Sequence, residues 1–349
     1  MINADNDIVI SGVAAISAAG VGTAPLIEAL AAGTSKLQPV PEEVIGESGH
    51  LWGKADSFRA SDYMSPLKAR KFDRSSLMAV VATGMALKDA AIDVPSLDAG
   101  RIGIVLGCGF GGIAYAEEFL RGYFTSGTEG LVPMLFPNIV PNASASNASI
   151  EHKLKGPNVT LIQRFCSAES AFLMAMRFLE EDRADIVVTG GVDELFPGML
   201  KGFKSIGQLH SFGAGFSEGA GLLVLERGAH ARARKARILA GVGGVRTIGR
   251  LSPGREEEGM ERLLGGCGDP ALIALSGTAT ADRELLARLP RVPTLDTGRI
   301  IGRALAMGGL SLTALALTLQ PGSRGVQLAA SPEGPYYAVE LTGGDPVSS

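Results

Sequence analysis

The side chains best suited to nucleophilic, acid–base or metal chemistry in this chain of 349 residues are three cysteines and four histidines. They are Cys108, Cys166, Cys267, His50, His152, His210 and His230. The cysteines form no CxxC pair, and no histidine stands within one helical turn of a cysteine or of another histidine. The spacing therefore predicts neither a disulfide framework nor a zinc site, and we expect no bound metal.

Short apolar runs followed by glycine mark the buried strands that must position such side chains. Many of the 47 glycines stand directly after these runs, where a buried strand turns into a loop or a helix. This pattern predicts an α/β protein with strands covered on both faces. The predicted strands are 8–10, 102–106, 159–162, 186–188, 222–225, 238–245, 272–275, 292–295, 326–330 and 336–341; the predicted helices are 24–32, 75–92, 113–124, 167–181, 229–237, 282–289 and 302–319.

Two similar halves, each a sheet wrapped in helices, fit this element order better than one sheet of ten strands. We place the boundary near Ala236, after the Arg-rich stretch 229–238, so that the halves are residues 1–236 and 237–349. The first half is the longer one. Its extra length leaves room for insertions that form a dimer interface.

Composition excludes several classes of function. With 46% apolar and 19% charged residues the chain folds around a large core, and a formal net charge of −4 does not favour a nucleic-acid-binding surface. The acidic start of the chain is unlike a signal peptide, and apolar stretches such as 310–319 are too short to span a membrane. We expect a cytoplasmic protein.

Six local strings, read in order, resemble the β-ketoacyl synthase family of condensing enzymes, and the resemblance spans nearly the whole chain. Individually each string is a weak signal, whereas their common order and spacing indicate shared ancestry and fold. The strings are IVISGVAAISAAG, FDRSSLMAVVATGMALKDAAID followed by RIGIVLGCGFGG, FPNIVPNASAS, GPNVTL, ADIVVTGGVDELFPGMLKGF and SEGAGLLVLERGAHARARKARI.

The resemblance implies a thiolase-like, five-layer αβαβα architecture built from two similar halves, in agreement with the glycine pattern. It also implies a dimer. In the family, edge strands near the position of residues 159–162 pair across a twofold axis, so the central sheets continue from one subunit to the next.

Decarboxylative condensation in this family needs one cysteine thiolate, which carries the acyl chain, and two histidines that stabilise the developing negative charge. Counting along GPNVTLIQRFCSAESA places the nucleophile's position at Phe165, a residue that cannot form an acyl intermediate. Phe165 is either a plain core aromatic or a wall where an acyl chain would otherwise attach. A rival alignment shifted by one residue makes Cys166 the nucleophile; a buried structural thiol is the other interpretation of Cys166.

The resemblance also places the two histidine positions. The string ALSGTAT puts Ser276 at the first, and GRALAMGG puts Arg303 at the second, while the family's lysine five residues upstream becomes Gly298. An arginine stays protonated and cannot act as a neutral imidazole, so we expect Arg303 to form a structural ion pair in the vacated space. His210 is the one histidine near the expected cleft, and we interpret it as a surface residue.

The sequence therefore predicts a noncatalytic subunit, similar to a chain length factor of a type II polyketide or fatty-acid-like synthase. It would pair with a catalytic ketosynthase subunit, act with a phosphopantetheinylated acyl carrier protein, bind no cofactor of its own, and set product length by shaping the acyl tunnel. The predicted tunnel residues are Met134, Leu135, Phe136, Ile139 and Phe165. Two alternatives stay open: an active condensing enzyme or acyltransferase that uses Cys166, helped by Ser276 or His210, and a structural homodimer that scaffolds carrier proteins.

Overall fold

The computed structural model describes residues 7–250, 254–289, 291–331 and 334–344. The strands are β1 (Ile8–Ser17), β2 (Gly20–Val21), β3 (Gln38–Pro39), β4 (Leu51–Gly53), β5 (Ile102–Gly107), β6 (Asn158–Leu161), β7 (Ile186–Asp193), β8 (Phe216–Ser217), β9 (Gly219–Arg227), β10 (Ala240–Ile248), β11 (Leu272–Leu275), β12 (Thr294–Asp296), β13 (Arg324–Ala330) and β14 (Tyr336–Gly343).

The α-helices are α1 (Thr23–Ala32), α2 (Glu42–Ile45), α3 (Pro66–Ala69), α4 (Arg74–Asp89), α5 (Ile113–Ser126), α6 (Ala143–His152), α7 (Ser167–Glu180), α8 (Pro197–Ser205), α9 (Gly228–Ala233), α10 (Glu256–Leu264), α11 (Ala279–Leu286), α12 (Thr297–Ile301) and α13 (Gly308–Thr318). Three 3₁₀ turns carry predicted site residues: η5 (Pro133–Asn138), η6 (Arg164–Cys166) and η7 (Leu209–Phe212).

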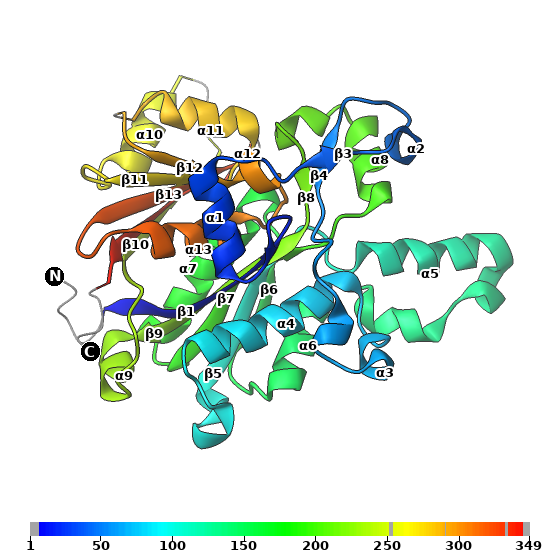
Figure 1. The fold of residues 1–349 in the computed structure, drawn as a ribbon, viewed down its shortest axis with the longest axis horizontal. Coiled ribbons are helices and arrows are strands. Elements are labelled where there is room, and N and C mark those ends of the chain that lie inside the picture. The colour runs from blue at the N-terminus through cyan, green and yellow to red at the C-terminus, as the bar shows by residue number, and fades with distance from the viewer. Residues whose placement is uncertain (1–6, 251–253, 290, 332–333, 345–349) are drawn as a thin grey trace.

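The main sheet contains eleven strands, and the short pairing of β1 with β10 divides it into two parts, here called the first and the second sheet (Figure 1). Strand β2 pairs with β1, and β3, β4 and β8 form a separate three-stranded sheet. The strand order is β6-β5-β7-β9-β1 in the first sheet and β10-β14-β13-β11-β12 in the second. Strands β5, β6 and β7 are parallel to one another, so their carboxyl ends meet at one edge. That edge is where an α/β sheet usually carries its site.

The two sheets and the helices around them form five layers. Side chains of α4 and α6 pack on the outer face of the first sheet, while α10 and α11 cover the outer face of the second. Helices α7 and α13 share one core with strands of both sheets and therefore form the middle layer. The αβαβα order expected from two similar halves is thus present, and each half contributes one of the two middle helices.

Most predicted strands are found, several with longer bounds. For the long last helix, however, the predicted first residue is wrong. The sequence predicts a helix over 302–319, whereas the structure ends α12 at Ile301 and begins α13 only at Gly308. Gly302 has a φ of 86°, outside the helical region, and the next residue, Arg303, pairs with the strand segment at Phe216. This interruption places the Arg303 side chain inside the fold.

The predicted boundary at 236/237 falls in the connection between α9 and β10, where the chain passes from the first sheet to the second. Within the described ranges, no helix combines the length and the apolar character that a membrane crossing requires.

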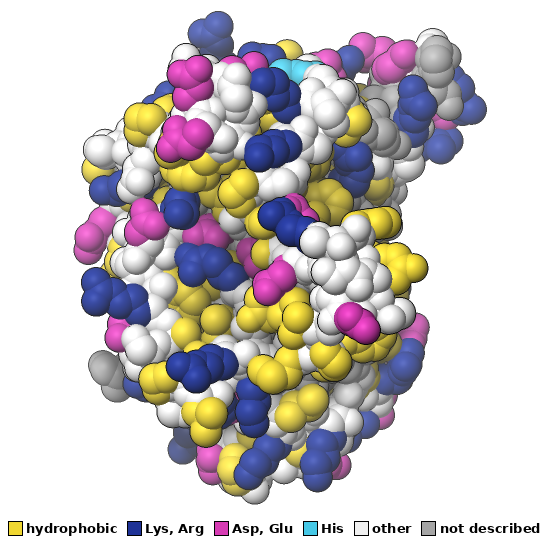
Figure 2. Space-filling view, turned by 90° about the vertical axis from the view of Figure 1, so that its right-hand side faces the viewer, with side chains coloured by type: hydrophobic (Ala, Val, Ile, Leu, Met, Phe, Trp, Pro, Cys, Tyr) yellow, Lys and Arg dark blue, Asp and Glu magenta, His cyan; other side chains and the backbone are white. Residues whose placement is uncertain are grey.

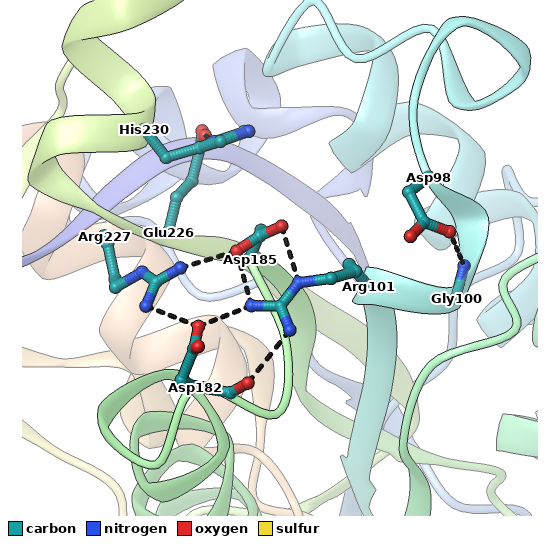
Figure 3. Close-up of polar contacts among 8 residues, drawn as sticks. All are labelled: Asp98, Gly100, Arg101, Asp182, Asp185, Glu226, Arg227 and His230. Carbon is teal, nitrogen blue, oxygen red and sulfur yellow. Dashed lines mark hydrogen bonds and ion pairs between the residues drawn. The ribbon is translucent and has the colours of Figure 1, made fainter.

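Four charged residues tie together the end of the first sheet that lies away from the carboxyl ends of β5 and β7 (Figure 3). Arg101, just before β5, and Arg227, at the end of β9, both bind Asp182 and Asp185 of the α7–β7 connection, at 2.5–2.8 Å. Hydrogen bonds from Arg101 hold the pKa of Asp185 below its ordinary value. The network therefore ties together three neighbouring strands, β5, β7 and β9.

Candidate functional site

A tight turn between β6 and α7 forms the elbow at which a nucleophile would be held. The Cys166 N–H donates to the Gln163 carbonyl at 3.0 Å, and the Ser167 hydroxyl donates to the Arg164 carbonyl at 2.7 Å. Arg164 has a φ of 51°, a left-handed conformation that is uncommon for a residue with a side chain. The turn therefore fixes which way the next two side chains, Phe165 and Cys166, point.

Phe165 is fully buried and belongs to a cluster of four phenylalanines. Its ring centroid lies 5.2 Å from that of Phe212, which in turn lies 4.9 Å from Phe203 and 4.8 Å from Phe216. The same cluster also contains Leu305 and three further buried aliphatic side chains, Val40, Ile45 and Leu200. The position that the resemblance assigns to the nucleophile is therefore filled by a ring that packs against other rings, as in a hydrophobic core.

Cys166 points in a different direction, into a small cluster with Ala329 and Tyr337. Its side chain is fully buried, and its Sγ lies 3.3 Å from the Pro335 carbonyl oxygen, to which it donates. Burial raises the pKa of the Cys166 thiol well above its ordinary value, and the nearby Glu169 carboxyl raises it further. A neutral thiol without solvent contact is a poor nucleophile.

Thiol labelling of the folded protein tests this placement. Cys108, Cys166 and Cys267 are each at most 2% exposed, and burial raises the pKa of Cys108 to about 12. We expect iodoacetamide at pH 8 to leave all three cysteines unmodified in the native protein and to label all three in denaturant, as read by intact-mass spectrometry. Fast, selective labelling of Cys166 in the native protein would contradict the buried placement.

Ser276 follows β11 and lies in a buried polar group with Glu169 and Gln327. The Ser276 hydroxyl donates to Glu169 Oε1 at 2.6 Å, and the Gln327 amide donates to the same Oε1 at 2.6 Å. The other carboxyl oxygen, Glu169 Oε2, has no hydrogen-bond partner among the described residues. Burial raises the pKa of Glu169 to about 7, so Ser276, at the position where the resemblance implies a histidine, lies beside a carboxyl group of near-neutral pKa.

Replacing Glu169 with glutamine should flatten the dependence of stability on pH. The pKa of Glu169 is about 7 in the folded chain, against an ordinary value of 4.5, so the folded state holds the proton more tightly than the unfolded state. The contribution of Glu169 to the free energy of unfolding is fully present below pH 4.5, where the carboxyl is protonated in both states. It is lost as the pH rises through 7, and the whole loss is about 3 kcal/mol. Chemical denaturation at pH 5, 6, 7 and 8 measures it.

Glu169→Gln should remove the part of the change in unfolding free energy with pH that is due to Glu169. Glu28→Gln, on an exposed face of α1, should leave the slope of unfolding free energy against pH unchanged. An unchanged slope in Glu169→Gln would show that the carboxyl is ionised or solvated in the folded chain.

Arg303 is buried and makes an ion pair. Its Nη2 lies 2.7 Å from Asp282 Oδ2 and 3.2 Å from Asp296 Oδ1, and its Nε donates to the Gly277 carbonyl at 3.1 Å. A Cβ atom on Gly298 would lie 2.4 Å from Nη1 of Arg303, so the guanidinium occupies the space that a side chain at Gly298 would need. The guanidinium is thus held by carboxylates and, at 4% exposed, is shielded from an anionic substrate in solvent.

Two buried carboxyls that sequence reasoning missed brace the carboxyl edge of the sheet. Asp193, at the end of β7, accepts from the backbone N–H groups of Gly109 and Ala306, each at 2.6 Å. Glu194 accepts from the Ala114 N–H at 2.9 Å. Burial raises the pKa of both carboxyls to about 7. The acidic pair directly after a buried strand is the signal that could have found them.

The predicted tunnel residues other than Phe165 lie on or after η5, beside α5, in the arm that extends to the right in Figure 1. Met134 and Phe136 are 72% and 59% exposed, whereas Leu135 is buried and Ile139 is half-buried. Figure 2 shows hydrophobic side chains among scattered charged ones on the face that this arm presents. The structure therefore does not bring Met134 and Phe136 next to Phe165.

His210 lies on η7, where its side chain is exposed and its Nδ1 is 3.0 Å from the Gly207 carbonyl oxygen. Within the described residues no three His, Cys, Asp or Glu side chains are arranged to hold a metal ion. The elbow thus holds a buried ring, Phe165, and a buried thiol, Cys166, and offers no accessible nucleophile. Elsewhere Ser276 is hydrogen-bonded to Glu169, and Arg303 is ion-paired with Asp282 and Asp296.

The five layers and two similar halves define the thiolase fold. Residues 5–231 match the family described as Beta-ketoacyl synthase, N-terminal domain. The chain belongs to the β-ketoacyl synthase family. Among curated proteins it is similar to the 3-oxoacyl-[acyl-carrier-protein] synthase 2 of Staphylococcus aureus strain COL, with 28% identity over 287 residues, which cover 76% of this chain and 69% of that protein.

A second relative, the 3-oxoacyl-[acyl-carrier-protein] synthase 2 of Rhizobium meliloti, is 29% identical over 289 residues, covering 74% of this chain and 68% of that protein. Solved structures agree on the fold. A type II polyketide synthase acyl-carrier protein in complex with its ketosynthase gives a TM-score of 0.82 at 20% identity, covering 97% of this chain and 99% of that chain. The ishigamide ketosynthase/chain length factor gives a TM-score of 0.81 at 23% identity, covering 97% of this chain and 100% of that chain.

Proposed function

We propose that this chain is a noncatalytic subunit, similar to a chain length factor, that pairs with an active ketosynthase in a type II polyketide or fatty-acid-like synthase. One observation carries the proposal: at the elbow before α7, the fully buried Phe165 ring stands where the family resemblance places the thiolate. A phenylalanine cannot accept an acyl group, so the chain would need a partner that supplies the cysteine.

The free edge of the first sheet supports pairing with such a partner. Strand β6 has a hydrogen-bonded neighbour, β5, on one side and none among the described residues on the other. Next to it, Ile162 is 49% exposed. The neighbouring arm adds a group of exposed apolar side chains: Leu120, Tyr123, Phe124, Val132, Met134 and Phe136. Unpaired strand edges and apolar surface of this kind are features of stable subunit interfaces.

The enzyme alternative rests on Cys166, and its geometry disfavours that role. Glu169 and Gln327 engage Ser276, the proposed helper, and His210 makes its own contact with Gly207. The homologues named above are catalytic synthases, so the noncatalytic role depends on the residues of this chain and not on those names.

Co-purification tests the pairing. The chain is co-expressed with a tagged ketosynthase that retains one cysteine and two histidines at the family positions. We expect a stable complex with equal amounts of the two chains. Phe124→Asp, on the exposed end of α5, should weaken it, whereas Ile206→Asp, at an exposed position after α8, should not. A chain that purifies only with itself would favour the scaffold alternative.

Product length tests the predicted tunnel role. If Phe136 forms the floor of the partner's acyl tunnel, Phe136→Ala should lengthen the products of the reconstituted pair, because a smaller side chain moves the tunnel end outward. Mass spectrometry of the products measures the change. Unchanged product lengths across substitutions at Met134, Leu135, Phe136 and Ile139 would remove the tunnel role.

A further inference from the structure

An open groove lies on the outer face of the first sheet, away from the middle layer that contains α7. Its lining residues come from α4, from the end of α6 and the residues that follow it, and from the segment 92–99. Helices α4 and α6 lie side by side (Figure 1). One section has a volume of about 700 Å³, and a second section of about 320 Å³ shares Gly84, Lys88, Glu151 and His152 with it. The first volume lies in the range of small-molecule sites.

The floor of the groove is apolar. Leu87 of α4 and the side chains of Ile92, Val94 and Leu97 line the larger section. Val80, Val81 and Met85 of α4 continue this surface in the smaller section. From Val80 to Lys88 the helix rises by about 12 Å, so the apolar strip has the length of an alkyl chain of moderate size.

The rim of the larger section is basic. Lys88, Lys153 and Lys155 line it, and none of the three has an ion-pair partner among the described residues. The one carboxylate that lines the groove, Glu151, is already paired with Lys68. The His152 Nε2 lies 2.8 Å from the Val80 carbonyl oxygen, to which it donates, so this ring is fixed as part of the wall. The rim therefore carries three positive charges without a counter-ion from the described part of the chain.

We propose that this groove binds the carboxylate form of a fatty acid, with the alkyl chain along α4 and the carboxylate among Lys88, Lys153 and Lys155. An apolar strip that ends in unpaired cations matches a ligand with one apolar tail and one anionic head. An acidic amphipathic helix is disfavoured, because a helix with side chains is about 10–12 Å wide and the larger section is a small-molecule hollow. The site lies outside the elbow, so the inference does not rest on the proposed function.

Isothermal titration calorimetry with octanoate, decanoate and laurate, each below its micelle concentration, tests the site on the purified full-length chain. We expect saturable binding with one ligand per chain and an affinity that rises at each step, since each fully buried methylene adds at most about fourfold. Dodecyltrimethylammonium, which has the same tail and a positive head, should not bind. Equal binding of the cationic analogue, or no binding of laurate, would overturn the proposal.

Two variants locate the ligand. Lys88→Gln/Lys153→Gln/Lys155→Gln should weaken laurate about tenfold, because each exposed ion pair contributes up to about fivefold. The matched control Lys36→Gln/Lys201→Gln/Lys235→Gln removes three exposed lysines elsewhere and should leave the affinity unchanged. Leu97→Glu, which places a negative charge on the floor, should abolish binding. Laurate affinity that is the same in all three variants, or displacement of laurate by an acidic helical peptide at lower concentration, would contradict a fatty-acid site in this groove.

Discussion

Replacing Phe165 with alanine is expected to lower the free energy of unfolding by about 3–5 kcal/mol. The Phe165 ring is fully buried against Phe212, which also contacts Phe203 and Phe216, so truncation leaves a cavity among rings that cannot close around it. Equilibrium denaturation in urea, read by circular dichroism, measures the change.

Phe124→Ala is the matched control, because this ring of α5 is 80% exposed and its removal should change stability by no more than about 0.5 kcal/mol. A loss below about 1 kcal/mol in Phe165→Ala would mean that the aromatic cluster is open to solvent, as an acyl site would be. Phe165→Cys is expected to restore no condensation, since the resemblance places Ser276 and Arg303 at the two histidine positions.

Replacing Arg303 with methionine is the second change with a large expected effect. It leaves Asp282, which is 2% exposed, without its cationic partner, and breaking a buried pair in this way costs about 3–5 kcal/mol. Burial already raises the pKa of Asp282 to about 6, and Arg303 counteracts that rise. Without Arg303 the pKa rises further, so the loss of stability should be largest at pH 8 and smaller at pH 5, where Asp282 takes up a proton.

Denaturation at the two pH values measures this effect. Adding Asp282→Asn to Arg303→Met should recover part of the loss at pH 8, because the amide carries no charge and its oxygen can still accept from the Gly277 N–H. Arg177→Met, which breaks an exposed pair with Glu180 on α7, should change stability by less than about 1 kcal/mol. An equally small effect of Arg303→Met would mean that the guanidinium is solvated and available to an anion.

The strands were the most predictable part of the fold. The strand at 272–275 has the predicted bounds, because four consecutive apolar residues between turn signals fit a strand buried on both faces. Helix α6 was missed because its sequence, ASASNASIEH, is rich in serine and alanine and shows no apolar stripe. Helix α10 was missed for a similar reason: it begins with three glutamates and buries only Met260 and Leu263.

The site could be predicted only in part. The resemblance located Phe165, Ser276 and Arg303, but sequence reasoning missed the buried partners Glu169 and Asp282. Glu169 stands three residues before the buried Phe172 on the same face of α7, and a carboxyl on an apolar helical face is the one signal that marks it. The long-range contacts that join these residues depend on how the two sheets enclose α7 and α13, which no local pattern encodes.

The buried partners also explain why the fold tolerates the replaced residues. Ser276, Glu169 and Gln327 hydrogen-bond to one another, although Glu169 Oε2 and Gln327 Oε1 have no partner among the described residues, and Arg303 pairs with two carboxylates. These side chains fill the space around the two positions that the resemblance assigns to histidines.

Intact-mass spectrometry of the reconstituted pair, after incubation with an acyl thioester of the carrier protein, tests the central claim most directly. The proposal predicts an acyl adduct on the ketosynthase partner alone, with the mass of this chain unchanged. An acyl adduct on this chain that disappears in Cys166→Ala would show that it carries the acyl group itself, and the noncatalytic assignment would be wrong.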